Sequence, residues 1–132
     1  MSLVLDTHAF VWWFEDPNLL SKGQRRALKK VGPDHPGYIS DLTLWEVATL
    51  VSLGRLRPRM PLREWFNLAL ERPGLQVHPI TPAIACELPS LPSAFHKDPA
   101  DRIIVSTARV LGVPLLTSDQ NIIDSGAVAV IV

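Results

Sequence analysis

The sequence predicts an α/β protein whose parallel, five-stranded sheet lies between two layers of helices, a three-layer α/β/α arrangement. Five short apolar runs have the composition of buried strands, and segments with helix caps or helical periodicity separate them. Continuous apolar strands that alternate with helices are typical of parallel sheets covered on both faces. The predicted strands are residues 2–5, 38–40, 75–78, 113–117 and 127–132.

Helix caps and chain breakers delimit the helices of the N-terminal half. Asp6 and Thr7 can cap a densely apolar helix that stops at Asp16-Pro17. Ser21 and Gln24 have the form of a capping box, in which each side chain bonds the other residue's backbone N–H, ahead of a basic amphipathic helix. The predicted helices of this half are residues 7–15, 22–31, 41–53 and 61–72.

The same signals delimit the C-terminal half. Thr81-Pro82 opens a short helix, and a proline-containing loop over residues 88–96 follows it. Asp98 is a suitable N-cap, and Pro99 is a suitable first helical residue because its φ is already helical and it has no N–H to satisfy. The predicted helices of this half are residues 82–88, 99–111 and, as a turn or short helix, 119–124.

Length and composition predict one domain spanning residues 1–132, large enough to bury a core without disulfides. The formal net charge is zero, which argues against a dedicated duplex-DNA binder, although a basic rim can coexist with an acidic site. Cys86 is the single cysteine, and its apolar neighbours predict a buried thiol in a reducing, cytoplasmic setting. Asp6 interrupts the first apolar run, so we expect neither a signal peptide nor a membrane span there.

Four carboxylates are expected at one rim of the predicted sheet. Ligands of parallel α/β sheets bind beyond the carboxyl ends of the strands. Asp6 follows the first predicted strand, and Asp119 follows the fourth. Glu46 lies early in the helix after the second strand, and Asp101 is the third residue of the helix that precedes the fourth strand. The topology can therefore bring all four side chains together.

Such a cluster favours a divalent cation. Converging carboxylates repel one another and raise some of their pKa values unless a cation neutralises them. Ligation by oxygen alone suits Mg²⁺ or Mn²⁺, ions that act on phosphodiesters by activating water and stabilising charge on phosphoryl oxygens. The sequence has no glycine-rich phosphate loop, zinc-ligand spacing or GxSxG nucleophile motif that would indicate other chemistry.

Each of these residues also has a purely structural interpretation. Asp6, Asp98 and Asp119 could serve only as helix caps, and Asp101 could form a surface ion pair with Arg102. Glu46 is harder to explain in this way, because a carboxylate among apolar neighbours needs a partner. Three hydroxyls beside the acids are accessory candidates that could orient carboxylates or water, and two histidines are interpreted as polar side chains near the rim. The hydroxyls are Thr7, Thr117 and Ser118, and the histidines are His8 and His96.

Four segments together resemble the PIN-domain family, and more narrowly the VapC-type toxins of bacterial and archaeal toxin–antitoxin pairs. The segments, which occur in the family's order and spacing, are residues 5–13 (LDTHAFVWW), 44–48 (LWEVA), 96–104 (HKDPADRII) and 115–119 (LLTSD). The resemblance implies strand order 3-2-1-4-5 and a Mg²⁺- or Mn²⁺-dependent endoribonuclease that is a homodimer and is inhibited by a cognate antitoxin. The family's metal-binding acids correspond to Asp6, Glu46, Asp101 and Asp119, with Asp98 as an additional acid.

The sequence departs from the subgroup at a lysine that relatives often carry after the glutamate motif, where this chain has Thr49-Leu50-Val51. The candidate RNA-binding residues are therefore Arg55, Arg57, Arg59 and Arg102. The basic helix over residues 25–30 could also hold RNA phosphates, but it is interpreted as a solvated face.

The tryptophans indicate where the core and an interface with a partner could lie. Trp45 is expected in the core. Trp12 and Trp13 are adjacent and cannot both enter one core from a helix, so at least one is expected at an interface with a second copy or an antitoxin segment.

Two further functions are compatible with the sequence. One is a catalytically idle PIN-like domain that binds RNA or protein, and the other is a different hydrolase with an acidic metal site, such as a phosphatase.

Overall fold

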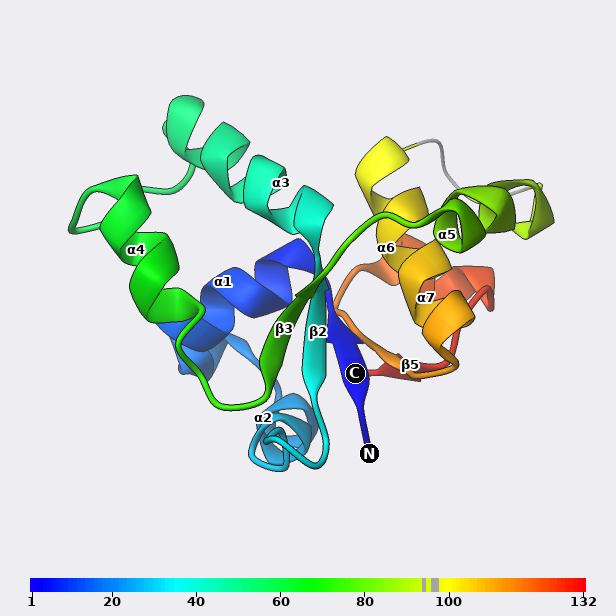
Figure 1. The fold of residues 1–132 in the computed structure, drawn as a ribbon, viewed down its shortest axis with the longest axis horizontal. Coiled ribbons are helices and arrows are strands. Elements are labelled where there is room, and N and C mark those ends of the chain that lie inside the picture. The colour runs from blue at the N-terminus through cyan, green and yellow to red at the C-terminus, as the bar shows by residue number, and fades with distance from the viewer. Residues whose placement is uncertain (94, 96–97) are drawn as a thin grey trace.

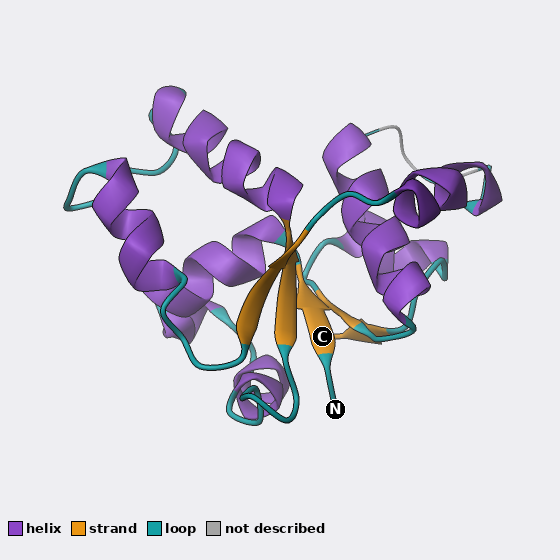
Figure 2. Cartoon of the chain, viewed as in Figure 1, coloured by secondary structure: helices purple, strands orange, loops and turns teal. Residues whose placement is uncertain are grey.

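A computed structural model describes residues 1–93, 95 and 98–132 of the chain. The five strands form one parallel sheet in the order β3-β2-β1-β4-β5, which confirms the predicted topology (Figure 1). Helices lie on both sides of the sheet (Figure 2). The strands are β1 (Leu3–Leu5), β2 (Gly37–Ser40), β3 (Leu75–His78), β4 (Leu115–Leu116) and β5 (Val130–Ile131).

The central strand β1 connects the two sides of the core. Val4 pairs with Tyr38 of β2 and with Leu115 of β4, and every residue of β1 is buried. Leu3 and Leu5 pack into one apolar cluster, whereas Val4 packs into the other, as alternation along a strand requires. The strands β4 and β5 are shorter than the predicted runs 113–117 and 127–132, because only two residues of each join the ladder.

The helices begin at the predicted caps. Six side chains each accept a hydrogen bond from a backbone N–H at a helix start, and they belong to Asp6, Ser21, Ser40, Thr81, Asp98 and Asp119. The helices are α1 (Thr7–Glu15), α2 (Lys22–Leu28), α3 (Asp41–Ser52), α4 (Leu62–Ala69), α5 (Pro82–Glu87), α6 (Pro99–Leu111) and α7 (Gln120–Ser125). Within the described residues, no helix combines the length and apolar character needed to cross a bilayer.

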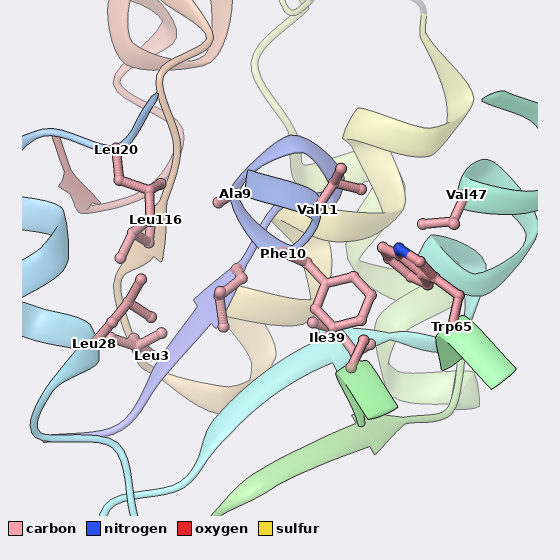
Figure 3. Packing of buried hydrophobic residues seen from close by; sticks show 12 residues of the cluster. Leu3, Ala9, Phe10, Val11, Leu20, Leu28, Ile39, Val47, Trp65 and Leu116 are labelled. Carbon is pink, nitrogen blue, oxygen red and sulfur yellow. The ribbon is translucent and has the colours of Figure 1, made fainter. Parts of the chain in front are cut away.

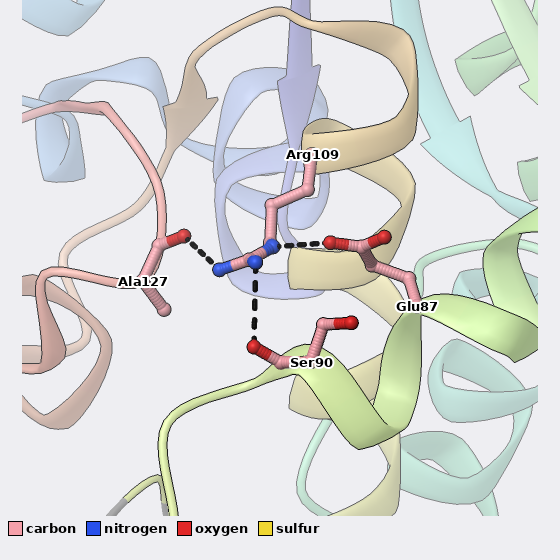
Figure 4. A network of polar contacts seen from close by, with 4 residues as sticks. All are labelled: Glu87, Ser90, Arg109 and Ala127. Carbon is pink, nitrogen blue, oxygen red and sulfur yellow. Dashed lines mark hydrogen bonds and ion pairs between the residues drawn. The ribbon is translucent and has the colours of Figure 1, made fainter.

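Two short 3₁₀ helices were not predicted. They are η1 (Pro17–Leu19) and η2 (Leu88–Ser90), and each has a proline in its first two positions. The expected loop over residues 88–96 therefore begins with one helical turn. Arg109 of α6 fastens this turn, because its guanidinium donates to the Glu87 carboxylate (2.7 Å), to the Ser90 carbonyl (3.4 Å) and to the Ala127 carbonyl (2.8 Å) (Figure 4).

The larger apolar cluster centres on aromatic side chains from α1 and α4 (Figure 3). Trp65 is fully buried, and its indole makes edge contacts with Phe10 and Phe14 at ring-centroid distances of 5.7 and 5.2 Å. Its indole N–H donates to the Glu15 carboxylate at 2.5 Å, so burial leaves no polar atom of this side chain unsatisfied. This packing joins α4 to α1, the helix that begins at Asp6.

Two predictions about burial were wrong. Trp45 is 72% exposed, because α3 turns Thr43 and Val47 inward instead. The helix is apolar on several sides, so its sequence pattern did not single out the buried face. Cys86 is exposed as well, since the short helix α5 buries only Ile84.

The burial of Trp65 predicts a large effect of its removal. We expect Trp65→Ala to lower the free energy of unfolding by about 3–5 kcal/mol, as for other large aromatic truncations in packed cores. Arg63→Ala, at an exposed residue of the same helix, is the matched control and should change stability by less than about 0.5 kcal/mol. Urea denaturation followed by circular dichroism would measure both, and equal effects of the two substitutions would contradict the assignment of the core.

Candidate active site

A cavity of about 360 Å³ lies beyond the carboxyl ends of β1 and β4, where α1 begins. Five carboxylates line it, together with hydroxyls and two ring side chains. The lining residues are Asp6, Thr7, His8, Trp12, Glu46, Asp98, Asp101, Ser118 and Asp119. The structure therefore brings together the four acids singled out in the sequence, the additional acid and two of the three accessory hydroxyls.

Asp6 is the most deeply buried of these acids, with 7% of its surface exposed. Its Oδ1 accepts the backbone N–H of Ala9 (2.8 Å), which caps α1, and its Oδ2 accepts the hydroxyl of Thr117 (2.5 Å). Burial raises the pKa of Asp6 above its ordinary value, although these two hydrogen bonds act in the opposite direction. The carboxylate is thus fixed in orientation in a place where its charge is poorly solvated.

Thr117 joins Asp6 to the second strand-end acid. Its Oγ1 donates to Asp6 and accepts the backbone N–H of Asp119 (3.0 Å). The Asp119 side chain accepts the N–H of Ile122 (3.2 Å) and so caps α7. Thr117 is fully buried and does not line the cavity, so it acts by holding the two acids rather than by facing a ligand.

The carboxylate of Glu46 in α3 accepts a hydrogen bond from a side chain of α1. The hydroxyl of Thr7 donates to Glu46 Oε1 at 2.5 Å and lies 3.1 Å from the hydroxyl of Thr43. Because the single proton of Thr7 is given to Glu46, Thr43 is the donor in the second bond. Burial raises the pKa of Glu46, and the nearby Asp98 adds to that effect.

Asp98 and Asp101 divide their roles along the first turn of α6. Asp98 is exposed, and its Oδ1 accepts the backbone N–H groups of Ala100 (2.9 Å) and Asp101 (3.2 Å). Asp101 is half-buried, and burial together with four neighbouring carboxylates raises its pKa to about 7. Those carboxylates belong to Asp98, Asp119, Glu46 and Asp6. The acids of the cavity therefore interact electrostatically as one group. His96, which precedes this turn, lies outside the described residues.

Gln24 binds the segment that carries Thr117 and Ser118. The sequence identified this residue only as part of a capping box. The capping box is present, with Gln24 accepting the N–H of Ser21 at 3.1 Å. The side-chain amide is also buried and donates to the carbonyl of Thr117 (3.2 Å) and the hydroxyl of Ser118 (3.1 Å). A local pattern cannot reveal this second role, because the partners lie more than 90 residues away along the chain.

Trp12 and His8 form the aromatic part of the wall. Their rings are 5.8 Å apart and tilted by 56°, and both residues lie in the first turns of α1. Trp12 is half-buried, as is Trp13, whose ring lies beneath the guanidinium of Arg72. The four candidate RNA-binding arginines are not among the lining residues: Arg55, Arg57 and Arg59 are exposed between α3 and α4, and Arg102 follows Asp101 in α6.

The chemistry of these donors fits a hard divalent cation. Across the described ranges, no three histidine, cysteine, aspartate or glutamate side chains are arranged to hold a metal ion as they stand. Mg²⁺ and Mn²⁺ do not require such a cage, because Mg²⁺ in particular binds through one or two carboxylates and keeps several waters. Five carboxylates line the cavity, and the pKa values of Asp6, Glu46 and Asp101 are raised, so a bound cation would neutralise charge that is poorly solvated.

A parallel sheet in this strand order, with an acidic cavity at its carboxyl edge, defines the class to which the chain belongs. The family model of the PIN domain matches residues 3–127, and the chain is therefore a member of the PIN-domain family. It is 31% identical over 121 residues to Ribonuclease VapC22 of Mycobacterium tuberculosis, an alignment that covers 92% of this chain and 89% of that protein.

Solved structures show the same fold. VapBC2 from Rickettsia felis, bound to a DNA fragment from its promoter, aligns with a TM-score of 0.74 and 13% identity over 98% of this chain and 97% of the other. DNA-bound VapBC from Salmonella typhimurium aligns with a TM-score of 0.71 and 15% identity over 98% and 96% of the two chains. At this level of identity the similarity concerns the fold alone.

The raised pKa of Asp101 predicts how pH affects the stability of the metal-free protein. Between pH 3.8, the ordinary value, and about 7, the folded state holds this proton more tightly than the unfolded state. The resulting contribution to stability is complete below pH 3.8 and is lost as the pH rises through 7. Asp101→Asn should shrink the fall in unfolding free energy between pH 5.5 and 8 by about 1–2 kcal/mol after allowance for solvent screening.

Urea unfolding in excess EDTA would measure this change. Asp34→Asn, which alters an exposed acid outside the cavity, should keep the pH dependence of the unmodified protein. If the unfolding free energy of Asp101→Asn depended on pH in the same way as that of the unmodified protein, the carboxylates would not interact as described.

Proposed function

We propose that this chain is a Mg²⁺- or Mn²⁺-dependent endoribonuclease and the toxin of a toxin–antitoxin pair. The observation that carries the proposal is the convergence of Asp6, Glu46, Asp101 and Asp119 on one cavity with coupled charges. The similarity to a protein named a ribonuclease supports RNA as the substrate.

The acids hold the metal in this proposal. Asp6, Glu46, Asp101 and Asp119 are its ligands, directly or through water, and Asp98 shapes the rim as a cap with an additional negative charge. A bound divalent ion supplies an activated water and neutralises charge on the phosphoryl oxygens. The threonines keep Asp6 and Glu46 in position, since Thr117 and Thr7 donate to them at 2.5 Å.

RNA would reach the cavity across a surface that offers both stacking and cations. Trp12 and His8 present rings at the wall, where a base can stack. Arg55, Arg57, Arg59 and Arg102 are the proposed contacts to phosphates further out. The exposed Ser118 hydroxyl, held by Gln24, is available to orient water or a phosphate oxygen.

Substitution of the proposed ligands tests the function directly. Asp6→Asn and Asp101→Asn should each reduce cleavage of a fluorophore-labelled RNA by at least about 10²-fold in MnCl₂, because a neutral amide is a poor ligand for a hard cation. Asparagine caps helices nearly as well as aspartate, so α1 should persist in Asp6→Asn, as judged by circular dichroism. Asp124→Asn is the control, since Asp124 bonds Gln120 on the surface and lies outside the cavity.

The alternatives give different results in the same experiment. Full cleavage in excess EDTA would contradict a metal mechanism. A catalytically idle domain would bind RNA without cutting it and would show no heat of Mn²⁺ binding at neutral pH. A phosphatase would hydrolyse a small phosphomonoester in preference to a structured RNA.

The proposed partners are a cognate antitoxin and a second copy of the chain, in the cytoplasm. Similar folds occur in VapBC complexes, which supports an antitoxin partner. The outer side of α3 supports a homodimer, because it carries the exposed apolar side chains Trp45 (72%) and Leu53 (60%) around a shallow hollow. Tryptophan is enriched at the centres of interfaces.

Trp45→Asp should therefore shift the chain from dimer to monomer. A charge placed in an apolar contact lacks a partner and destabilises the association. Sedimentation velocity at micromolar concentration would measure the change, with Leu68→Asp on α4 as a control at another exposed apolar residue. A monomeric unmodified protein, or a dimer unaffected by Trp45→Asp, would contradict this surface.

A further inference from the structure

A second surface, separate from the acidic cavity, is lined by cationic side chains from the α2 region and from the segment that follows α4. It consists of two adjoining hollows of about 380 and 320 Å³ that share Arg25 and Lys29 of the α2 region. Lys22 and Arg26 complete one hollow, and Arg72 with Trp13 belongs to the other. In the part of the chain that the structure describes, no acidic residue lines either hollow, and neither hollow shares a residue with the acidic cavity.

We propose that this basic surface binds the phosphodiester backbone of single-stranded RNA. The inference deepens the proposed ribonuclease function, because it assigns to the substrate a second contact remote from the acids.

Arg72 is a half-buried cation that has no carboxylate partner within the described residues. Its guanidinium stacks 4.0 Å over the ring of Trp13, and one of its nitrogens donates to the Trp13 carbonyl at 3.0 Å. In the described part of the chain, the ion pair found is that of Arg109 with Glu87, and Arg72 makes no other polar contact. Burial lowers the pKa of Arg72, as expected for a charge that has lost water without gaining an anion. An anion in the hollow would supply the missing partner.

The helix α2 presents its cations on one side. Gln24 and Leu28 point into the protein, whereas Lys22, Arg26 and Lys29 are exposed. Arg25 is fixed over the preceding turn, since its guanidinium donates to the carbonyls of Leu20 (2.9 Å) and Pro17 (3.4 Å). Favourable interaction with the helix dipole explains cations near the end of α2. It does not explain Arg72, which comes from the segment between α4 and β3.

The lining of the second hollow favours a nucleic acid over an acidic peptide. Among the described residues, four cations and no apolar residue line the second hollow, so a peptide that mixes acidic and apolar side chains has nothing apolar to contact there. Lys22 and Lys29 are about 10 Å apart along the helix axis at the α-helical rise, which suits a ligand with regularly spaced charges. In the first hollow, Trp13 and the neighbouring apolar side chains offer a base a surface to rest on.

The surface is also connected to the acidic cavity through α2 itself. The buried side of this helix carries Gln24, whose amide bonds the Ser118 hydroxyl at the cavity wall. The first turn of α2, which also carries Lys22, therefore lies beside the cavity wall, so an RNA strand bound along α2 would have one end near the acids. The chain has no net charge, and the separation of cations from acids lets a polyanion approach a cluster that would otherwise repel it.

Binding of RNA in excess EDTA tests this surface independently of cleavage. Fluorescence anisotropy of a labelled single-stranded oligonucleotide would give the affinity at several salt concentrations. We expect Lys22→Ala/Arg26→Ala to weaken binding at least about fivefold and to reduce the slope of log K against log salt by about 1.4, the value for two lost phosphate contacts. Lys30→Ala/Arg63→Ala removes the same charge from exposed residues that line neither hollow, and should leave the slope unchanged.

Arg72→Met provides a second measurement. It should weaken RNA binding and reduce the change in tryptophan fluorescence that RNA causes at Trp13, with the fold checked by circular dichroism. An unchanged affinity and slope in Lys22→Ala/Arg26→Ala would overturn the proposal. Equal competition by poly-glutamate would also overturn it, in favour of an acidic protein partner.

The outcome is separable from that of the nuclease proposal. If the double variant loses affinity in EDTA while the unmodified protein fails to cut RNA in MnCl₂, the basic surface stands and the ribonuclease assignment fails. If cleavage occurs but binding in EDTA does not depend on these cations, the opposite holds.

Discussion

The buried hydrogen bond from Thr117 to Asp6 is the contact on which the acidic site depends. It joins the ends of β1 and β4, and the same hydroxyl accepts the N–H of Asp119. Asp6 in turn caps α1, so the start of that helix, two strand ends and two acids share one small network. A partly satisfied network at this depth would cost more than an apolar contact, and both oxygens of Asp6 and the hydroxyl of Thr117 have their partners.

The arrangement of these acids also has an energetic cost. Placing Asp6, Glu46 and Asp101 where burial raises their pKa values costs free energy in the metal-free protein. The fold offsets that cost elsewhere, in the aromatic packing around Trp65 and in the fully buried strand β1. Residues that destabilise a fold but converge on one cavity are typical of functional sites.

The sequence could predict the fold because its signals are local. Helix caps such as Asp98 and Thr81 act within three residues, and the short apolar strands follow from composition. The convergence of the acids could also be predicted from the sequence, because the strand order places them together at the carboxyl ends of the strands, where parallel sheets bind ligands. Trp45 was misplaced because its helix carries apolar residues on several sides, so the sequence pattern has no unique buried stripe and tertiary packing selects the buried face.

Gln24 and Arg72 show a different limit of prediction. The amide of Gln24 bonds Thr117 and Ser118, and Arg72 lies over Trp13 from a segment 59 residues away. No periodicity or motif encodes such contacts, because they exist only once the chain is folded. Gln24 belongs to α2, and Arg72 lines a hollow beside it. None of the four segments that resemble the family includes this helix.

The structural and functional interpretations of the aspartates are compatible rather than exclusive. Asp98 and Asp119 cap their helices through Oδ1, and in the described part of the chain their Oδ2 atoms accept no hydrogen bond. A cap therefore fixes the side chain and still leaves an oxygen for the cavity. Helix starts at the carboxyl edge of a parallel sheet thus provide oriented carboxylates without additional structure. Asp119, which looks like an ordinary helix cap in the sequence, can for this reason also serve as one of the proposed ligands.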